Sequence, residues 1–185
     1  MQRRKFVVGL GSLAAGGAAA LGTGAFTSVT ATRNVDVEVA NDSDAYLGLS
    51  GVDGDNKEYI TDNGSSGTLS IDLDGDQSVP GNGEGVNPNA LTEIDHLFKI
   101  KNQGTQTVDV SLSKTGANSG LIEFYATDDS SESDPYSNGT QIDGSDSVSL
   151  GTGEYTVVSL KIDTRGSGVS DDDKLLNDVT INATA

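Results

Sequence analysis

Strict alternation of apolar and polar residues over short segments is the feature of this sequence that most limits how it can fold. A period of two places every second side chain on one face of a strand, whereas an amphipathic helix needs apolar residues three and four apart. Turn residues separate the segments, and no stretch has a helical stripe longer than two turns. The expected strands are Val35–Val39, Tyr46–Leu49, Glu58–Thr61, Leu69–Leu73, Ile94–Ile100, Val108–Leu112, Leu121–Thr127, Ser147–Leu150, Tyr155–Asp163 and Asp178–Ala183.

About eight to ten strands separated by frequent turns predict an all-β fold. We expect a two-sheet antiparallel β-sandwich, jelly-roll-like, with an extended N-terminal strand. The turn Asp53-Gly54-Asp55-Asn56 is expected to join Tyr46–Leu49 and Glu58–Thr61 as a hairpin. The 185 residues then divide into a signal segment at 1–25, an N-terminal strand or arm at 26–40, and a β-sandwich domain at 41–185.

The charge of the chain predicts an acidic, well-solvated surface. Eleven basic and 28 acidic residues give a formal net charge of −17, and removing Arg3, Arg4 and Lys5 with a signal leaves 8 against 28, or −20. Because the acidic residues are spread between the strands, we interpret them as an adaptation to multimolar salt, where screening removes their repulsion. The same field argues against nucleic acid or an anionic membrane as a partner. The absence of cysteine excludes disulfides and thiolate metal sites.

The first 25 residues have the layout of a secretory signal peptide. A basic start precedes a run of small and apolar residues, and the run Arg-Arg-Lys-Phe-Val-Val is typical of a twin-arginine export signal. A permanent membrane anchor is the alternative, but the span is weakly apolar and no basic cluster follows it. We therefore expect a secreted protein, extracellular or at the cell surface, without stable membrane insertion after cleavage. The export residues are Arg3, Arg4 and Phe6, and the cleavage junction is Thr23, Ala25 and Phe26, although cleavage after Ala31 is also open.

The sequence contains no recognisable catalytic motif, and we expect no enzyme. His96 is the single histidine, so a His-Glu-x-x-His zinc site is impossible, and no Gly-x-Ser-x-Gly elbow is present. By strand alternation His96 shares a face with Ile94 and Phe98, which predicts a half-buried core or rim residue. A hydrolase with an unrecognised site is a distant alternative.

Two kinds of surface site are suggested by short motifs. Asp72, Asp74 and Asp76 place three carboxylates on alternate positions where a strand enters a turn, and hard cations such as calcium prefer oxygen ligands. This candidate calcium site lacks the Gly and Glu of an EF-hand loop, and it is the sole cofactor that we consider. Four Asn-x-Ser/Thr sequons, which lie in or beside expected turns and termini, are candidate glycosylation sites: Asn41, Asn63, Asn138 and Asn182.

Several segments resemble known groups of exported proteins. The junction Leu21-Gly22-Thr23-Gly24-Ala25-Phe26, followed by a β-sandwich, is similar to the TasA/camelysin group of secreted filament and biofilm-matrix proteins, and the Phe98–Asn102 strand adds to this similarity. Over most of its length, the chain also resembles a haloarchaeal family of twin-arginine-exported proteins. The segments that carry this second resemblance are Ala25–Val29, Arg33–Ala40, Asp44–Leu49 and Leu97–Asn102.

The resemblance implies assembly of this chain with copies of itself. Members of the TasA-like group have jelly-roll folds and polymerise by donating the mature N-terminal segment as a strand to the next subunit. The donor here would be about Phe26 to Val39, with its apolar residues as the assembly strand: Phe26, Val29, Val35, Val37 and Val39. Such a head-to-tail contact does not close on itself and produces a filament.

The expected function is therefore a secreted structural subunit of an extracellular filament or biofilm-matrix fibre, assembling by donor-strand exchange. Two alternatives stay open at this point. Arg33–Ala40 is equally well explained as the first strand of its own sandwich. The protein could also be a monomeric cell-surface β-sandwich binding module, calcium or glycan dependent, without a polymer function.

Overall fold

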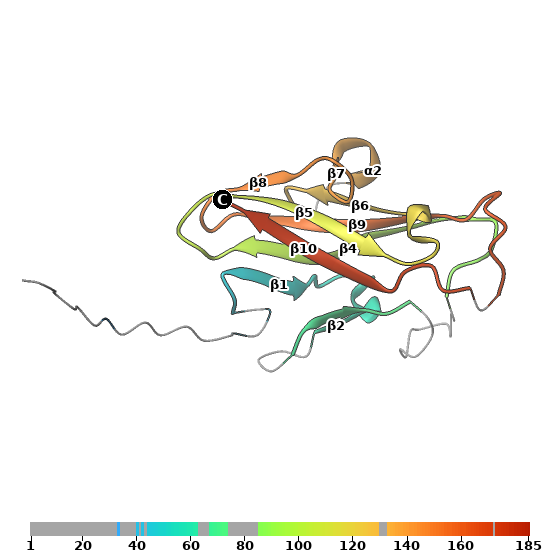
Figure 1. Cartoon of the computed structure of the whole chain (residues 1–185), viewed down its shortest axis with the longest axis horizontal. Coiled ribbons are helices and arrows are strands. Elements are labelled where there is room, and N and C mark those ends of the chain that lie inside the picture. Colours follow the sequence, from blue (N-terminus) through green and yellow to red (C-terminus); the bar gives the residue numbers. More distant parts are fainter. Residues whose placement is uncertain are drawn as a thin grey trace, which may run out of the picture. The chain divides into compact units, whose positions relative to one another are not determined.

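A computed structural model describes Arg33, Ala40, Asp42 and residues 44–62, 67–73, 85–129, 133–171 and 173–185 (Figure 1). The chain divides into two units, Met1–Glu38 and Val39–Ala185. All described secondary structure belongs to the second unit. The predicted export and assembly residues lie outside the described residues: Arg3, Arg4, Phe6, Thr23, Ala25, Phe26, Val29, Val35, Val37 and Val39.

The second unit consists mainly of antiparallel strands, as the alternation predicts. The first sheet has the order β1 (Leu47–Gly51), β4 (Leu91–Asn102), β9 (Tyr155–Asp163), β6 (Ile122–Thr127) and β7 (Thr140–Gln141). The second sheet has the order β10 (Asp178–Thr184), β5 (Val108–Thr115) and β8 (Val148–Leu150). A separate hairpin pairs β2 (Ile60–Asp62) with β3 (Leu69–Ile71). Short helical turns are formed by η1 (Lys57–Tyr59), η3 (Ser119–Leu121) and α2 (Pro135–Asn138).

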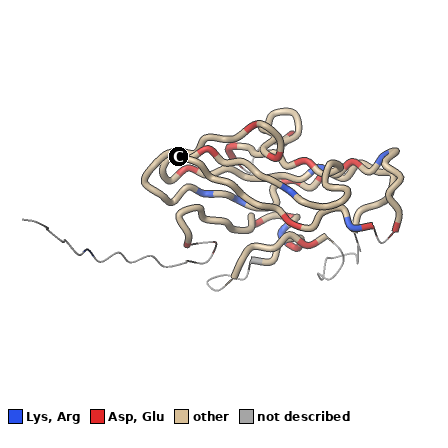
Figure 2. Tube along the Cα trace, in the orientation of Figure 1, with Lys and Arg blue, Asp and Glu red and all other residues tan. Residues whose placement is uncertain are grey.

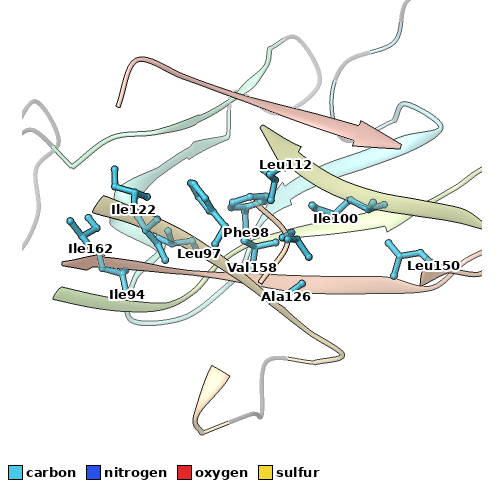
Figure 3. Close-up of a cluster of buried hydrophobic side chains, with 14 residues drawn as sticks. Ile94, Leu97, Phe98, Ile100, Leu112, Ile122, Ala126, Leu150, Val158 and Ile162 are labelled. Atoms are coloured by element: carbon cyan, nitrogen blue, oxygen red, sulfur yellow. The ribbon is translucent and has the colours of Figure 1, made fainter. Parts of the chain in front are cut away.

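The two larger sheets enclose one apolar core, which makes the unit a β-sandwich (Figure 3). Alternate residues of each strand enter this core, as Val158, Leu160 and Ile162 of β9 illustrate. The other buried apolar members come from both sheets: Ile94, Leu97, Phe98, Ile100, Val110, Leu112, Ile122, Phe124, Ala126, Ile142 and Leu150. Acidic residues are spread along the trace rather than collected in one tract (Figure 2).

One predicted hairpin is wrong. Strands β1 and β2, which correspond to Tyr46–Leu49 and Glu58–Thr61, do not pair with each other. β1 pairs with β4, and β2 pairs with β3. The physical reason is burial, because Leu47 and Leu49 reach the core only when β1 lies beside the long strand β4. The Asp53–Asn56 turn instead belongs to a longer connection, in which the Asn56 Nδ2 donates to the Asp95 carbonyl oxygen at 2.7 Å.

The two sheets are joined along one side by the segment that runs from β7 to β8. The Ile142 N–H donates to the Phe124 carbonyl on β6 at 2.9 Å, and the Ile142 carbonyl accepts from the Leu112 N–H on β5 at 2.6 Å. Ile142 is fully buried. Ile142 therefore has backbone hydrogen bonds to both sheets. We call the segment from β7 to β8, residues 140–150, the spine.

A buried ion pair holds the spine next to this crossing. Lys114 on β5 pairs with Asp143, and their side chains are 14% and 1% exposed. The Lys114 ammonium also donates to the Ile122 carbonyl, and Asp143 Oδ1 accepts from the Phe124 N–H at 3.0 Å. Both charges therefore have hydrogen-bond partners, as buried charges require.

Candidate assembly edge

The strand order leaves one opening in the sandwich. Because the spine connects β6 to β5, the hydrogen-bonded strands form a single series that starts at β1, passes through β4, β9, β6, the spine and β5, and ends at β10. Within the described part of the chain, no backbone hydrogen bond connects β1 with β10. We call the break between these two strands the opening; Figure 1 shows where β1 and β10 lie.

Partly buried apolar side chains line both borders of the opening. Leu47 and Leu49 on β1, and Val179 and Ile181 on β10, all pack against the core without being fully enclosed. The β2–β3 hairpin packs against the same core through residues that include Ile60. A strand added here would therefore meet apolar neighbours on its inner face.

Strand β10 is the longest edge strand, and it has almost no protection against pairing. It is seven residues long, pairs among the described strands with β5 alone, and contains no Pro, no Gly and no basic residue. Its one charge is Asp178 at its first position. Edge strands normally avoid unwanted pairing by being short or by containing charge, Pro or bulges. The residues from Val179 to Thr184 carry no charge that would oppose such pairing.

The opposite border, β1, is already partly occupied. The Leu49 N–H donates to the Asp42 carbonyl at 2.7 Å, and the Asp42 carboxylate accepts from the Leu69 N–H of β3, also at 2.7 Å. Asp42 therefore bonds to β1 and to the β2–β3 hairpin. Of the two borders, β10 is the one whose outer backbone groups form no backbone hydrogen bond with any described residue.

The structure brings few of the sequence-predicted surface residues together. Asp72 follows β3 and donates its N–H to the Tyr59 carbonyl at 2.9 Å, while Asp74 and Asp76 lie outside the described residues. No group of three or more metal-ligating side chains occurs among the described residues.

Two of the four sequons are described. Asn138 is the exposed last residue of α2. Asn182 is exposed on β10, and its Nδ2 donates to the Ser113 Oγ at 3.4 Å. Asn41 and Asn63 lie outside the described residues.

His96 lies in a wide bulge of β4. Between the pairs Ile94–Leu160 and Phe98–Val158, three residues of β4 face Ser159 alone. His96 is partly buried, as expected, but it has a φ of 52° and so interrupts the alternation. Its backbone N–H donates to the Ser159 Oγ at 2.9 Å, while its Nε2 is buried and has no hydrogen-bond partner among the described residues. Ser159 is fully buried and bonds to the backbone of His96, so these two side chains do not form a nucleophile and base pair.

A polar network fastens α2 to the outer face of the five-stranded sheet. The Tyr136 hydroxyl donates to Asp95 Oδ1 at 2.7 Å and lies 3.2 Å from the Leu160 carbonyl. Burial, followed by the hydrogen bond to Asp95, raises the pKa of Tyr136 well above its usual range. The Tyr136 ring meets Tyr125 edge to face at 5.5 Å. This network has the character of packing between α2 and the sheet, and it contains no open reactive group.

Comparison with known proteins places no relative beside this chain: no family model and no curated protein matches its sequence. Across the described ranges, no helix is long and apolar enough to cross a bilayer. The opening, and the position of β10 at a sheet edge, were not identified from the sequence, which predicted an assembly strand at 26–39 but no acceptor for it. The alternation of Val179 and Ile181 with polar residues marks β10 as a strand, but no local signal in the sequence shows which strand lies at an edge.

Proposed function

We propose that this protein is a secreted structural subunit of an extracellular filament or matrix fibre, which assembles by adding the N-terminal strand of one copy to the next. The observation that supports the proposal is the unprotected edge of β10 at the opening. Strand addition uses the backbone groups of an edge for affinity and alternate side-chain positions for fit.

The N-terminal arm has the composition that this edge would accept. Val35, Val37 and Val39 alternate with Asp36 and Glu38. In a strand, the three valines face one side and the two acids face the other. Placed beside β10, the valines would continue the apolar row of Val179 and Ile181, and the acids would point to solvent.

The charge of the subunit adds a condition to assembly. Copies with a net charge of −20 after signal removal repel each other in dilute buffer. At about 1 M salt the screening length falls to about 3 Å, so the repulsion disappears while the short-range backbone bonds persist. We therefore expect assembly at high salt and dissociation on dilution.

The test uses the mature chain starting at Phe26 and two kinds of variant. Deleting 26–39 removes the arm with its three alternating valines, and Thr180→Lys places a charge on the exposed side of β10. Ser113→Lys is the matched control, because Ser113 lies directly opposite Thr180 on β5 but is not at the edge. Light scattering and electron microscopy in high salt measure assembly, and circular dichroism measures folding.

The proposal predicts filaments for the parent and for Ser113→Lys, and monomers for the deletion and for Thr180→Lys, with all four chains folded. A parent protein that stays monodisperse at every concentration would instead indicate a monomeric binding module. Filaments that survive the arm deletion would exclude strand donation by this segment. Equal assembly of Thr180→Lys and Ser113→Lys would exclude β10 as the acceptor.

A further inference from the structure

Two lysines on β4 lie on the same strand face without a carboxylate partner among the described residues. Lys114, Lys161 and Arg165 each form an ion pair with a neighbouring acid. Lys99 and Lys101, by contrast, have no such contact in the part of the chain that the structure describes. With 28 acidic residues available, two adjacent unpaired lysines on one strand face concentrate positive charge at a single place.

Both lysines lie on the outer face of the five-stranded sheet. Their neighbours Phe98, Ile100 and Asn102 point into the core, so the alternate positions 99 and 101 point outward. On one side, Lys101 is paired in register with Tyr155 of β9. On the other side, β1 places the small residues Gly48 and Ser50 opposite Lys101 and Lys99.

Two exposed tyrosines flank the lysines. Tyr155 is 42% exposed, and the Lys99 ammonium lies 5.5 Å from the centroid of its ring. Tyr46, just before β1, is 84% exposed, and its carbonyl accepts from the Gln103 N–H at 2.8 Å, next to the end of β4. We call Tyr46, Lys99, Lys101 and Tyr155 the lysine–tyrosine face. It spans three strands, which is about 10 Å at the usual strand spacing.

We propose that the lysine–tyrosine face binds an acidic polysaccharide, one that bears carboxylate or sulfate groups on its sugars. The two ammonium groups match the anionic groups of such a polymer, and the exposed tyrosine rings offer flat apolar surfaces for the C–H faces of its sugars. The extended face suits a polymer lying across the strands better than a single small ion. Acidic loops of a second copy of the chain would match the lysines but would leave the tyrosine rings without a flat partner.

The acidic remainder of the surface limits where such a polymer can bind. Net negative charge repels a polyanion from everywhere except a locally positive face. In high salt this long-range repulsion is screened within a few ångströms, at about 3 Å for 1 M, and contacts at the face itself remain. The binding site is therefore confined to this face, and the inference does not depend on filament formation.

The experiment measures binding of the folded mature protein to the acidic polysaccharide polygalacturonate. Dextran, an uncharged polysaccharide, is the control ligand. Lys99→Gln/Lys101→Gln removes the two charges, and Tyr155→Ala removes one ring. Lys57→Gln/Lys174→Gln is the matched control, because it removes two exposed lysines that lie elsewhere. Isothermal titration calorimetry in high salt gives the affinity, and sedimentation velocity reports self-association of each variant.

We expect the parent and the Lys57/Lys174 control to bind polygalacturonate equally and dextran not at all. The Lys99/Lys101 variant should bind about tenfold more weakly, as expected for the loss of two exposed charge contacts, and Tyr155→Ala should also lose affinity. An equal loss in both lysine pairs would mean general charge attraction and would overturn the proposal. No binding by the parent, together with self-association that depends on Lys99 and Lys101, would assign the face to a second copy and would equally overturn it.

Discussion

Removing the buried carboxylate beside the spine should destabilise the protein strongly. In Asp143→Ala, Lys114 loses its one carboxylate partner, and the Phe124 N–H loses its side-chain acceptor. Breaking a buried ion pair by deleting one partner costs about 3–5 kcal/mol. The Lys114 side chain keeps 14% exposure and can approach water, so we expect the lower end, about 3 kcal/mol. That is a large part of the total stability of about 5–15 kcal/mol typical of a domain.

Urea unfolding followed by circular dichroism at fixed salt measures this loss. Asp146→Ala is the control, since Asp146 is an exposed carboxylate of the same connection, and we expect it to change the free energy of unfolding by less than about 0.5 kcal/mol. Lys114→Met/Asp143→Asn removes both charges and keeps an acceptor for the Phe124 N–H, so it should recover most of the loss. If Asp143→Ala were no more destabilising than Asp146→Ala, the assignment of a stabilising ion pair at the spine would be refuted.

Three further predictions concern individual residues. At the left-handed position of the bulge, His96→Val should cost about 1–2 kcal/mol more than His96→Asn in the same unfolding assay, because a β-branched residue is strained at a φ of 52°. The Arg165 guanidinium and backbone N–H lower the pKa of Asp163 to about 2, so this pair should contribute stability that is present above pH 3.8 and lost as pH falls through about 2. In an NMR titration, Arg165→Gln should raise the pKa of the carboxyl only part of the way to its ordinary value, because the backbone N–H of residue 165 still donates to it. Tyr136→Phe should lower the free energy of unfolding by about 1 kcal/mol, because it removes the hydrogen bond to Asp95. Since burial raises the pKa of Tyr136, the stability that this phenol contributes should be present below pH 10 and decline at higher pH. In an ultraviolet titration, the phenol should not ionise until the protein unfolds.

Most of the fold could be predicted because alternation is a local signal. The strands at 155–163 and 178–183 appear within one residue of their expected bounds, and the strand at 108–112 begins where expected and runs three residues further, since each has a clear apolar face. Pairing was harder to predict, because it depends on contacts between distant parts of the chain. The wrong hairpin between Tyr46–Leu49 and Glu58–Thr61 followed from their closeness in sequence, whereas burial against β4 decides the partner of β1.

The surface features could be predicted only in part. A sequence shows that Lys99 and Lys101 alternate on one strand, but not that Tyr155 lies beside them, because that depends on the register between β4 and β9. The His96 bulge was hidden for a related reason. It adds two residues, so Ile94 and Phe98 keep the same face and the apolar pattern looks uninterrupted. Short loops such as the one containing α2 have too little periodicity to be recognised.

The spine also determines how this sandwich would respond to mechanical force. Ile142 ties β6 to β5 on one side, while the opposite side has no such tie within the described residues. We therefore expect the opening to widen more easily than the spine side, because within the described residues no backbone bond between β1 and β10 has to break. Tension that enters along β10 would pull its seven residue pairs with β5 in shear, so that all of them resist together rather than peeling one at a time. A load applied along β10 would therefore be shared by all seven residue pairs with β5.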